Sequence, residues 1–235
     1  MATSTALAFA SSTLTPQDTH TLTQVWSNLK ADSCPHSYNF HLHTHCSDGQ
    51  LHPEDLIQQA VNLGLKGLAI TDHHSVRGYQ AAQRWLEEAK IEQPHQQLPH
   101  LWTGVEITST LLNIEVHILG YAFDPNHSAL RNYLKGNAPK GNKAKAVNVI
   151  SAIHQAGGLV VLAHPERYRL PAQKLVPAAV QAGIDGVETY YAYRRTNPWK
   201  PTPAQTKQVE NLSEQFDLFR TCGTDSHGLN ILLRL

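Results

Sequence analysis

Short apolar segments alternate with amphipathic ones along most of this chain, and this alternation restricts the possible folds more than any other feature. The apolar segments have the length of buried strands, and the segments between them carry the helical apolar period. Strands are expected at residues 38–43, 67–71, 101–107, 115–121, 159–163, 185–189 and 218–222. Helices are expected at residues 16–30, 53–63, 78–90, 145–156, 172–182 and 202–215. The pattern is typical of an α/β fold with a parallel sheet, open or closed.

The composition sets limits on function. Of 235 residues, 41% are hydrophobic, which is enough for a core and too many for a disordered chain. Nineteen Lys and Arg balance nineteen Asp and Glu, which argues against a nucleic-acid binder that relies on a basic surface. No apolar run approaches the roughly 18 residues that a membrane span needs. We therefore expect no membrane association and no stable binding to duplex nucleic acid.

The cysteines and the first residues bear on the compartment. Cys34, Cys46 and Cys222 form no C-x-x-C pair, and an odd, sparse count does not suggest a disulfide framework. Residues 1–15 lack the basic and apolar regions of a secretory signal and are expected to form a frayed tail. The sequence thus predicts free thiols in a reducing, cytoplasmic compartment.

Histidines and carboxylates stand just past the ends of all the expected strands except the sixth. They are His41, His43, Asp48, Asp72, His73, Glu106, His117, His164, Asp225 and His227. In parallel barrels the chemistry lies at this end of the strands. Imidazoles and carboxylates without a thiolate cluster suit Zn, Mn or Fe(II). Because burying so many such groups unpaired would be very costly, the pattern predicts a metal centre.

Each of these residues also has an ordinary structural explanation when it is taken alone. Asp48 stands in a Ser-Asp-Gly turn, Asp72 could cap the helix over residues 78–90, and Glu106 could be a carboxylate at the rim. A single histidine at a strand end is more often hydrogen-bonded or half-exposed than a metal ligand. The joint pattern is what favours a metal site.

Six motifs resemble, in order, those of the PHP (polymerase and histidinol phosphatase) family of metallophosphoesterases. They are FHLHTHCSDG (40–49), AITDH (69–73), GVEI (104–107), VHILG (116–120), AHP (163–165) and GTDSH (223–227). The resemblance covers about residues 38–232 and implies a distorted seven-stranded (β/α)7 barrel. It divides the chain into an N-terminal tail and helix at 1–37 and a PHP domain at 38–235. Within that domain, a cap-like excursion is expected at about 124–146.

The resemblance further implies up to three divalent ions, of Mn, Fe or Zn, and it assigns their ligands by motif. The first ion would take His41, His43, Glu106 and Asp225. The second would share Glu106 and add His117 and His164, and the third would take Asp48, His73 and His227. Strand geometry cannot choose between the two overlapping His-x-His pairs at 41–45. The family places its aspartate five residues after the second ligand, so Asp48 selects His41 and His43 and leaves His45 at a variable position.

The sequence departs from the family pattern in three places. Asn39 stands where the family often has an aspartate, and His74 stands where an acidic residue often follows the Asp-His pair. The excursion carries lysines in place of the arginines of the family's helical cap, at Lys135, Lys140, Lys143 and Lys145. Substrate preference therefore cannot be transferred through the excursion.

The activity implied is hydrolysis of small phosphomonoesters, such as nucleoside 3′,5′-bisphosphates, or of short oligonucleotides, by a hydroxide that bridges the ions. Asp72 and His227 are candidates to steer protons, with Asp72 more suited to orient ligating imidazoles. Arg167 could clamp a phosphate through its two-pronged guanidinium. Weaker candidates for substrate binding are Arg194, Arg195, Lys200 and the lysines of the excursion, Lys143 among them. Zero net charge favours a small phosphorylated substrate over a long polyanion.

Three alternatives stay open. Histidinol phosphate is a second substrate within the same chemistry. The chain could also be a metal-binding regulatory module without turnover, although its ligand set is complete. Amide or lactone hydrolysis on a related barrel usually needs a carboxylated lysine, and no lysine lies at an expected strand end.

Overall fold

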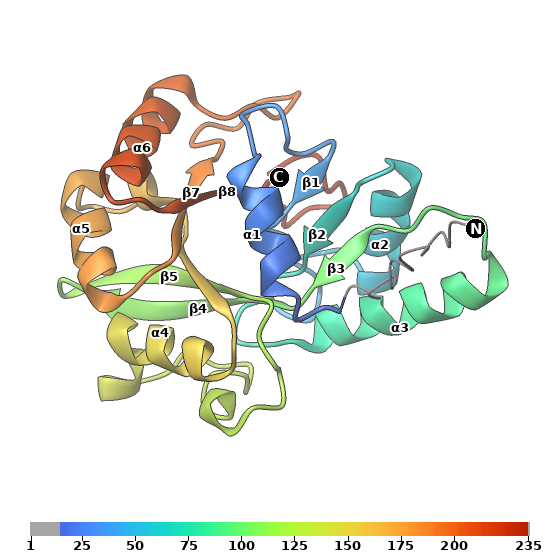
Figure 1. The fold of residues 1–235 in the computed structure, drawn as a ribbon, viewed down its shortest axis with the longest axis horizontal. Helices are drawn as coiled ribbons and strands as arrows, with labels where there is room; N and C mark the ends of the chain where they lie inside the picture. Colours follow the sequence, from blue (N-terminus) through green and yellow to red (C-terminus); the bar gives the residue numbers. More distant parts are fainter. Residues whose placement is uncertain (1–14, 235) are drawn as a thin grey trace, which may run out of the picture.

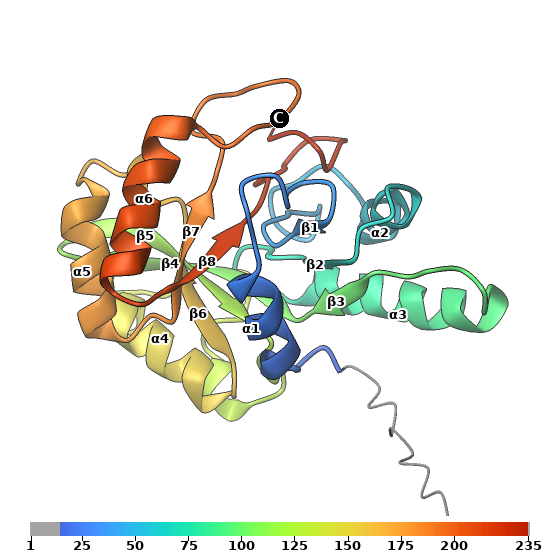
Figure 2. The same cartoon turned by 45° about the horizontal axis from the view of Figure 1, so that its top comes forward.

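The computed structural model describes residues 15–234, which fold into two β-sheets with helices on their outer faces (Figures 1 and 2). A parallel sheet contains β1 (Tyr38–Asn39), β2 (Gly67–Ala69) and β3 (His100–Trp102). The second sheet has the order β4 (Gly104–Leu111), β5 (Ile114–Tyr121), β6 (Leu159–Leu162), β7 (Gly186–Tyr190) and β8 (Phe219–Cys222). The expected α/β class is thus confirmed, and the expected tail over residues 1–14 lies outside the described residues.

The second sheet is mixed, whereas the sequence predicted a parallel one. β4 and β5 pair in antiparallel fashion, as do β5 and β6, and the pairs from β6 to β8 are parallel. The cause is the two-residue connection at Leu112 and Asn113, which have φ of 50° and 60°. A two-residue turn with positive φ at both positions joins antiparallel strands, and a parallel pair needs a much longer crossover.

The closed seven-stranded barrel is not confirmed, because strand pairing leaves two open sheets with eight strands within residues 15–234. The strand expected at 101–107 is divided at Thr103 between β3 and β4. Backbone hydrogen bonds still join the sheets at two seams. At one seam, His43 N–H donates to Ser226 O at 3.1 Å, and at the other His74 N–H donates to Glu106 O at 3.0 Å. The strand ends of both sheets therefore meet.

The helices lie close to their expected positions. They are α1 (Thr19–Ser27), α2 (Pro53–Asn62), α3 (Arg77–Glu92), α4 (Ala146–Gln155), α5 (Ala172–Ala182) and α6 (Pro203–Gln215). Figure 1 shows α2 and α3 beside the parallel sheet and α4, α5 and α6 around the mixed one. The excursion at 124–146 contains two short 3₁₀ helices, η1 (Ser128–Leu130) and η2 (Gly141–Ala144). None of the described helices is long and apolar enough to span a bilayer.

Helix α1 packs where the two sheets meet. Its buried Leu22 and Trp26 belong to one hydrophobic cluster with Phe40, Trp102 and Tyr121. The ring of Trp26 lies edge-on to that of Tyr121 at 5.2 Å between centroids. Because these partners come from both sheets, α1 holds the sheets together from one side and leaves the strand ends open on the other.

The prediction of three free thiols is wrong. Cys34 and Cys222 form a disulfide, with their Cα atoms 6.1 Å apart, and only Cys46 is free. The two paired cysteines are 188 residues apart, so no local spacing pattern could show that the fold brings them together. The sequence argument for a reducing compartment therefore no longer applies.

Candidate metal centre

The predicted ligands converge where the two sheets meet. Three overlapping groups each offer ligand atoms within 4.8 Å of one another: His41, His43, Glu106 and Asp225; His43, Asp48, His73 and His227; and His73, Glu106 and His117. Eight of the nine predicted ligands are in these groups. The ninth, His164, places Nε2 3.4 Å from Glu106 Oε1. The groups also differ from the family assignment in setting His73 beside Glu106 and His117.

Glu106 is at the centre of the cluster and is 1% exposed. Its Oε1 lies 2.7 Å from Nδ1 of His117, and its Oε2 lies 3.0 Å from Nε2 of His41 and 3.1 Å from Nε2 of His43. The residue points inward from β4, at the seam where its backbone N–H donates to Asp72 O. A carboxylate whose two oxygens face different imidazoles has the arrangement that a ligand shared between two ions requires.

Asp48 and His227 form the more open side of the cluster. Asp48 Oδ2 lies 3.2 Å from His227 Nε2, and the imidazole rings of His227 and His43 stack with centroids 4.1 Å apart. His227 Nδ1 lies 2.9 Å from the backbone carbonyl oxygen of Asp225. Because that oxygen can only accept, Nδ1 carries the proton and Nε2 is free to bind an ion or exchange a proton.

Glu188 is a site residue that the sequence reasoning missed. This wholly buried side chain comes from β7, the sixth expected strand, which we predicted to deliver no such group. Its Oε1 lies 2.9 Å from Nδ1 of His41, and its Oε2 accepts a hydrogen bond from His164 N–H at 2.8 Å. The sequence signal that could have found it was a glutamate in the interior of a short expected strand, between Val187 and Thr189. A carboxylate behind an imidazole fixes the ring and its protonated nitrogen, as is common around bound metals.

Asp225 is held by a second set of side chains. Its Oδ1 lies 3.4 Å from His41 and 3.3 Å from His43, facing the cluster. Its Oδ2 accepts hydrogen bonds from Tyr191 OH at 2.6 Å and from the Arg167 guanidinium at 3.0 Å. One oxygen is thus directed toward the imidazoles and the other is anchored away from them.

The backbone is strained at two predicted ligands. His164 has a φ of 27° and Asp225 a φ of 53°, in the left-handed region that residues other than glycine rarely adopt. Such residues cost on the order of 1–3 kcal/mol each and collect at functional sites. Both strained residues belong to the cluster, because His164 Nε2 lies 3.4 Å from Glu106 Oε1 and Asp225 shares a group of ligand atoms with Glu106.

Electrostatics couple the carboxylates to the imidazoles. Burial alone would lower the pKa of His43, but the nearby Asp225 and Glu106 carboxylates outweigh it and raise the pKa to about 9. Burial alone would raise the pKa of Glu106, but His41 and His117 hold it well below its usual range. Burial dominates at His73 and lowers its pKa to about 4. Without an ion, the cluster therefore keeps its carboxylates charged by retaining protons on some of its imidazoles.

The donors fit divalent ions. Within the described chain neither ring nitrogen of the fully buried His43 makes a well-directed hydrogen bond, and Nδ1 of His164 has no partner. Buried polar atoms normally have a hydrogen-bond partner. The lack of such a partner at these nitrogen atoms is explained if they bind a ligand or an ion. Imidazole and carboxylate donors suit divalent transition-metal ions, and the three groups overlap at His43, His73 and Glu106.

A cavity of about 440 Å³ opens onto the cluster. Seven predicted ligands line it, together with Gln50 and three arginines, Arg167, Arg195 and Arg234. Arg167 and Arg195, both candidates for substrate binding, line this cavity, whereas Arg194 and Lys143 do not. The third arginine, Arg234, was not among the candidates. Nothing in the local sequence marked Arg234, which lies just before the C-terminus.

Asp72 does not line this cavity either. It is fully buried, and its carboxylate accepts hydrogen bonds from Thr44 N–H and Oγ1 and from Ser47 Oγ, each at 2.7 Å. These contacts fix the loop that carries Asp48. The structure therefore places Asp72 behind the site, against hydroxyl and backbone groups rather than against an imidazole.

His45 points away from the cluster. It is exposed, and its ring lies against that of His52 with centroids 4.2 Å apart. His41 and His43 are both buried beside Glu106. The pair of histidines that faces the cluster is thus the pair indicated by the position of Asp48.

Comparison with known proteins confirms the predicted family. The model of the PHP domain matches residues 39–174. The 5′-3′ exoribonuclease Rnm of Salmonella typhimurium is 25% identical, in an alignment that covers 81% of this chain and 85% of the relative. A 3′,5′-nucleoside bisphosphate phosphatase of Chromobacterium violaceum is 31% identical, but the match covers only 51% of this chain and 39% of that protein.

Solved structures show the same fold. A candidate metal-dependent phosphoesterase from Bifidobacterium adolescentis superposes with a TM-score of 0.66 at 24% identity, covering 83% of this chain and 88% of that one. An amidohydrolase from Chromobacterium violaceum, solved with bound sulfate and no metal, superposes with a TM-score of 0.67 at 19% identity, covering 84% and 89%.

The predicted partner, a small phosphorylated substrate without stable binding to duplex nucleic acid, is wrong. Exoribonucleases of Salmonella typhimurium and Haemophilus influenzae both match over 81% of this chain, which points to nucleic acid rather than to small molecules. The prediction rested on a net charge of zero. Net charge averages over the whole surface and is insensitive to a local group of cations such as the three arginines of the cavity.

Proposed function

This chain belongs to the PHP domain family, and we propose that it is a metal-dependent phosphoesterase whose substrate is single-stranded RNA, which it shortens from the 5′ end. One observation carries the proposal. The Glu106 cluster opens into a cavity whose other walls present Arg167, Arg195 and Arg234. A phosphodiester bound there meets ligands for metal ions on one side and guanidinium donors on the other. The similarity to exoribonucleases over most of the chain supports the same substrate class.

Ions held by the nine ligands would supply Lewis acidity and a water molecule acidified toward neutral pH. We assign one position to His41, His43, Glu106 and Asp225, and a second to Glu106 with His117 and His164. A third is assigned to Asp48, His73 and His227. Glu188 and Asp72 support this arrangement from behind, because Glu188 orients His41 and Asp72 fixes the loop that carries Asp48.

The arginines bind and orient the phosphate. Arg167 NH1 is already held by Tyr191 OH at 3.0 Å and by Asp225 Oδ2 at 3.0 Å, so its guanidinium is fixed beside the cluster. Arg234 packs over the ring of Tyr191 at 5.1 Å. Guanidinium groups fixed in advance lose little freedom when they bind a phosphoryl group, and they stabilise the negative charge that builds up on it.

With the third position empty and both of its ring nitrogens protonated, His227 would give its Nε2 proton to the leaving oxygen and return to the neutral ring that keeps a proton on Nδ1. Its Nδ1 is engaged by the Asp225 carbonyl, so both roles use the same Nε2 atom. The ring is about one-fifth exposed and lines the cavity. A bound phosphate ester can therefore approach Nε2 directly.

The test uses protein reconstituted with Mn, Fe(II) or Zn and RNA labelled at either end. We expect mononucleotides to be released first from the 5′ label, with the 3′ label retained in a shrinking ladder. Glu106→Gln serves as the inactive control, and p-nitrophenyl phosphate, a nucleoside bisphosphate, histidinol phosphate and a lactone complete the panel. Internal cuts, release from the 3′ end or faster turnover of any panel compound would overturn the RNA assignment. Bound metal without any turnover would indicate a regulatory module.

A further inference from the structure

Positive charge is concentrated in one part of this electrically neutral chain. Residues 125–165 contain no Asp or Glu, but they contain five cationic side chains, Arg131, Lys135, Lys140, Lys143 and Lys145. The rest of the chain therefore carries fourteen cationic residues against all nineteen carboxylates. All five cations are exposed. A local cationic surface on a neutral protein attracts polyanions to that face alone.

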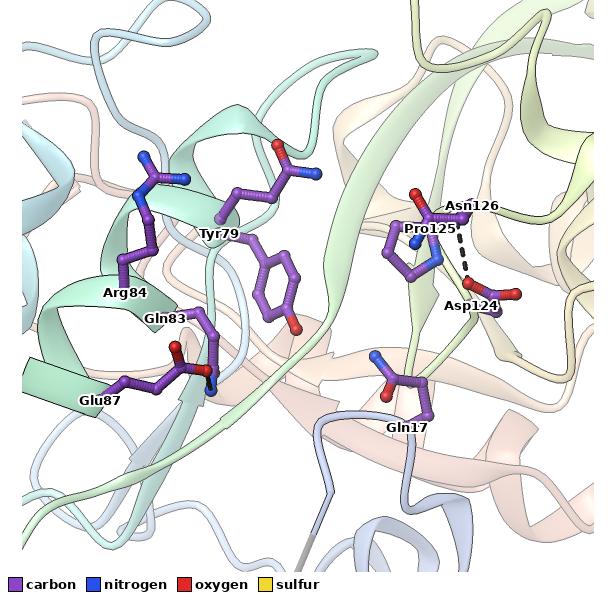
Figure 3. A pocket seen from close by; sticks show the side chains of 9 residues that line it. Gln17, Tyr79, Gln83, Arg84, Glu87, Asp124, Pro125 and Asn126 are labelled. Carbon is purple, nitrogen blue, oxygen red and sulfur yellow. Dashed lines mark hydrogen bonds between the residues drawn. The ribbon is translucent and has the colours of Figure 1, made fainter. Parts of the chain in front are cut away.

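A groove runs between this segment and α3. Its inner part is a cavity of about 580 Å³ that includes Arg77, Gln80 and Lys135 in its lining. Its outer part is a cavity of about 550 Å³ between α3 and residues 124–126, and Figure 3 shows the side chains of its walls, among them Arg84. The two cavities share Gln80 and Pro125, so they form one continuous groove.

The inner end of the groove adjoins the metal centre. Its lining includes Ser75 and Val76, which directly follow the histidine pair at 73–74. Gly136 N–H donates to the carbonyl oxygen of His74 at 2.8 Å, which ties the cationic segment to this turn. On the other wall, the Arg77 guanidinium donates to Cys46 O at 3.2 Å, in the loop that carries Asp48. The groove therefore begins beside the predicted ligands and leads away from them.

Two cations of the groove are available to a ligand, and its two carboxylates each accept a hydrogen bond from a neighbouring residue. Arg84 and Lys135 are exposed, and neither forms an ion pair within residues 15–234. Glu87 accepts a hydrogen bond from Gln83 at 3.0 Å, and Asp124 accepts one from Asn126 N–H at 2.9 Å, drawn as a dashed line in Figure 3. The remaining polar groups are the hydroxyls of Ser75 and Tyr79 and several amides, all of which can donate hydrogen bonds to phosphate.

We infer that this groove holds the RNA strand on the 3′ side of the bond that is cleaved, with Lys135 and Arg84 contacting successive backbone phosphates. The inference rests on the proposed function, which places the 5′ end of the strand in the arginine-lined cavity. A strand that leaves the metal centre along the groove passes Lys135 first and Arg84 later. Sites of this kind combine a cationic track with little sequence preference.

The test compares the double variant Lys135→Gln/Arg84→Gln with the control Lys174→Gln/Lys207→Gln, which removes two exposed cations from α5 and α6. Each metal-loaded protein is assayed on a dinucleotide and on single-stranded RNA of about 12 nucleotides, within the range of roughly 4–16 typical of single-strand sites. Binding of the longer RNA is measured separately, by fluorescence anisotropy in chelator, so that no cleavage occurs.

In the groove variant we expect KM for the longer RNA and its Kd to rise by about three- to tenfold, with dinucleotide turnover unchanged. The logarithm of the RNA-binding constant falls as the logarithm of the salt concentration rises, and this slope should become shallower by about 1.4 in the variant. Each lost contact with a single-strand phosphate removes about 0.7, and the variant loses two such contacts. The control should match the wild type. The proposal that the groove binds RNA would be refuted if both double variants showed equal effects. It would also be refuted if the groove variant lost as much activity on the dinucleotide as on the longer RNA. Absence of RNA cleavage by the wild type would instead overturn the proposed function, and the anisotropy measurement would still test the groove.

Discussion

Glu188 Oε1 lies 2.9 Å from Nδ1 of His41, so a fully buried carboxylate stands directly behind a predicted metal ligand. The same side chain accepts the backbone N–H of His164 through its other oxygen. One residue of β7 thus sets the position of two imidazoles that come from opposite sheets. It also keeps the proton of His41 on Nδ1, which leaves Nε2 directed at Glu106.

Replacing Glu188 with Gln should therefore weaken metal binding without unfolding the chain. The amide has the same shape, but it loses the charge that holds the His41 ring and presents an N–H₂ group to one of its two present donors. Changes of this kind typically cost 10–100-fold in metal affinity. Metal affinity measured by competition with a chelator is the test, and the exposed Glu214→Gln is the control. Unchanged affinity in the Glu188 variant would show that His41 is oriented by other contacts.

Replacing Glu106 with Gln should abolish turnover and lower metal content. Both oxygens of Glu106 face imidazoles, so no other residue can compensate for the lost charge. We expect a loss in kcat of at least about 10³-fold. Metal content and kcat are measured together, and Glu115→Gln, exposed on the neighbouring strand, is the matched control. Retained activity would refute the shared-carboxylate assignment.

Breaking the disulfide should destabilise the protein. Cys34 and Cys222 close a loop with a sequence separation of 188, and cross-links over long loops restrict the unfolded chain most. The variant Cys34→Ser/Cys222→Ser should lose about 2–5 kcal/mol of unfolding free energy, as measured by denaturant titration. Cys46→Ser removes the free thiol and should leave stability within about 0.5 kcal/mol. If the two variants were equally stable, the cross-link would contribute nothing.

The start of α1 gives a prediction for the pH dependence of stability. Asp18 accepts hydrogen bonds from Thr21 N–H at 2.9 Å and Oγ1 at 2.7 Å, and the bond from the backbone N–H is the main cause of its lowered pKa. Because the folded pKa lies below the unfolded value of 3.8, this stabilisation is complete above pH 3.8. It is lost as the pH falls through the folded pKa.

The measurement compares Asp18→Ala with Asp18→Asn in thermal or denaturant unfolding between neutral and acidic pH. At neutral pH the Ala variant should lose about 1 kcal/mol and the Asn variant much less, since Asn also caps helices well. The difference between wild type and Asn should vanish in acid. A difference that grew as the pH fell would contradict the capping role.

The elements of the fold were largely predictable, because helix and strand patterns are local. Helices α2 to α6 begin and end within two residues of their expected positions, whereas α1, expected over residues 16–30, begins at Thr19 after its Asp18 cap and ends at Ser27. The mixed sheet was not predicted, although the strands expected at 101–107 and 115–121 leave only seven residues between them, too few for a parallel crossover. That part of the error was therefore avoidable. The division of one strand at Thr103 and the open sheets depend on how distant segments pack.

The sequence by itself determined the kind of chemistry. Residues such as His43 and Glu106 lie at the ends of strands that local patterns predict, and their side chains supply the donor atoms of a metal site. Only the tertiary structure decided which nitrogen faces which oxygen, that Glu188 supports His41, and that Arg234 rather than Arg194 reaches the cavity. These relationships join atoms on separate strands and loops. Their geometry is set by the packing of the whole core, to which every segment contributes, and no local pattern records it.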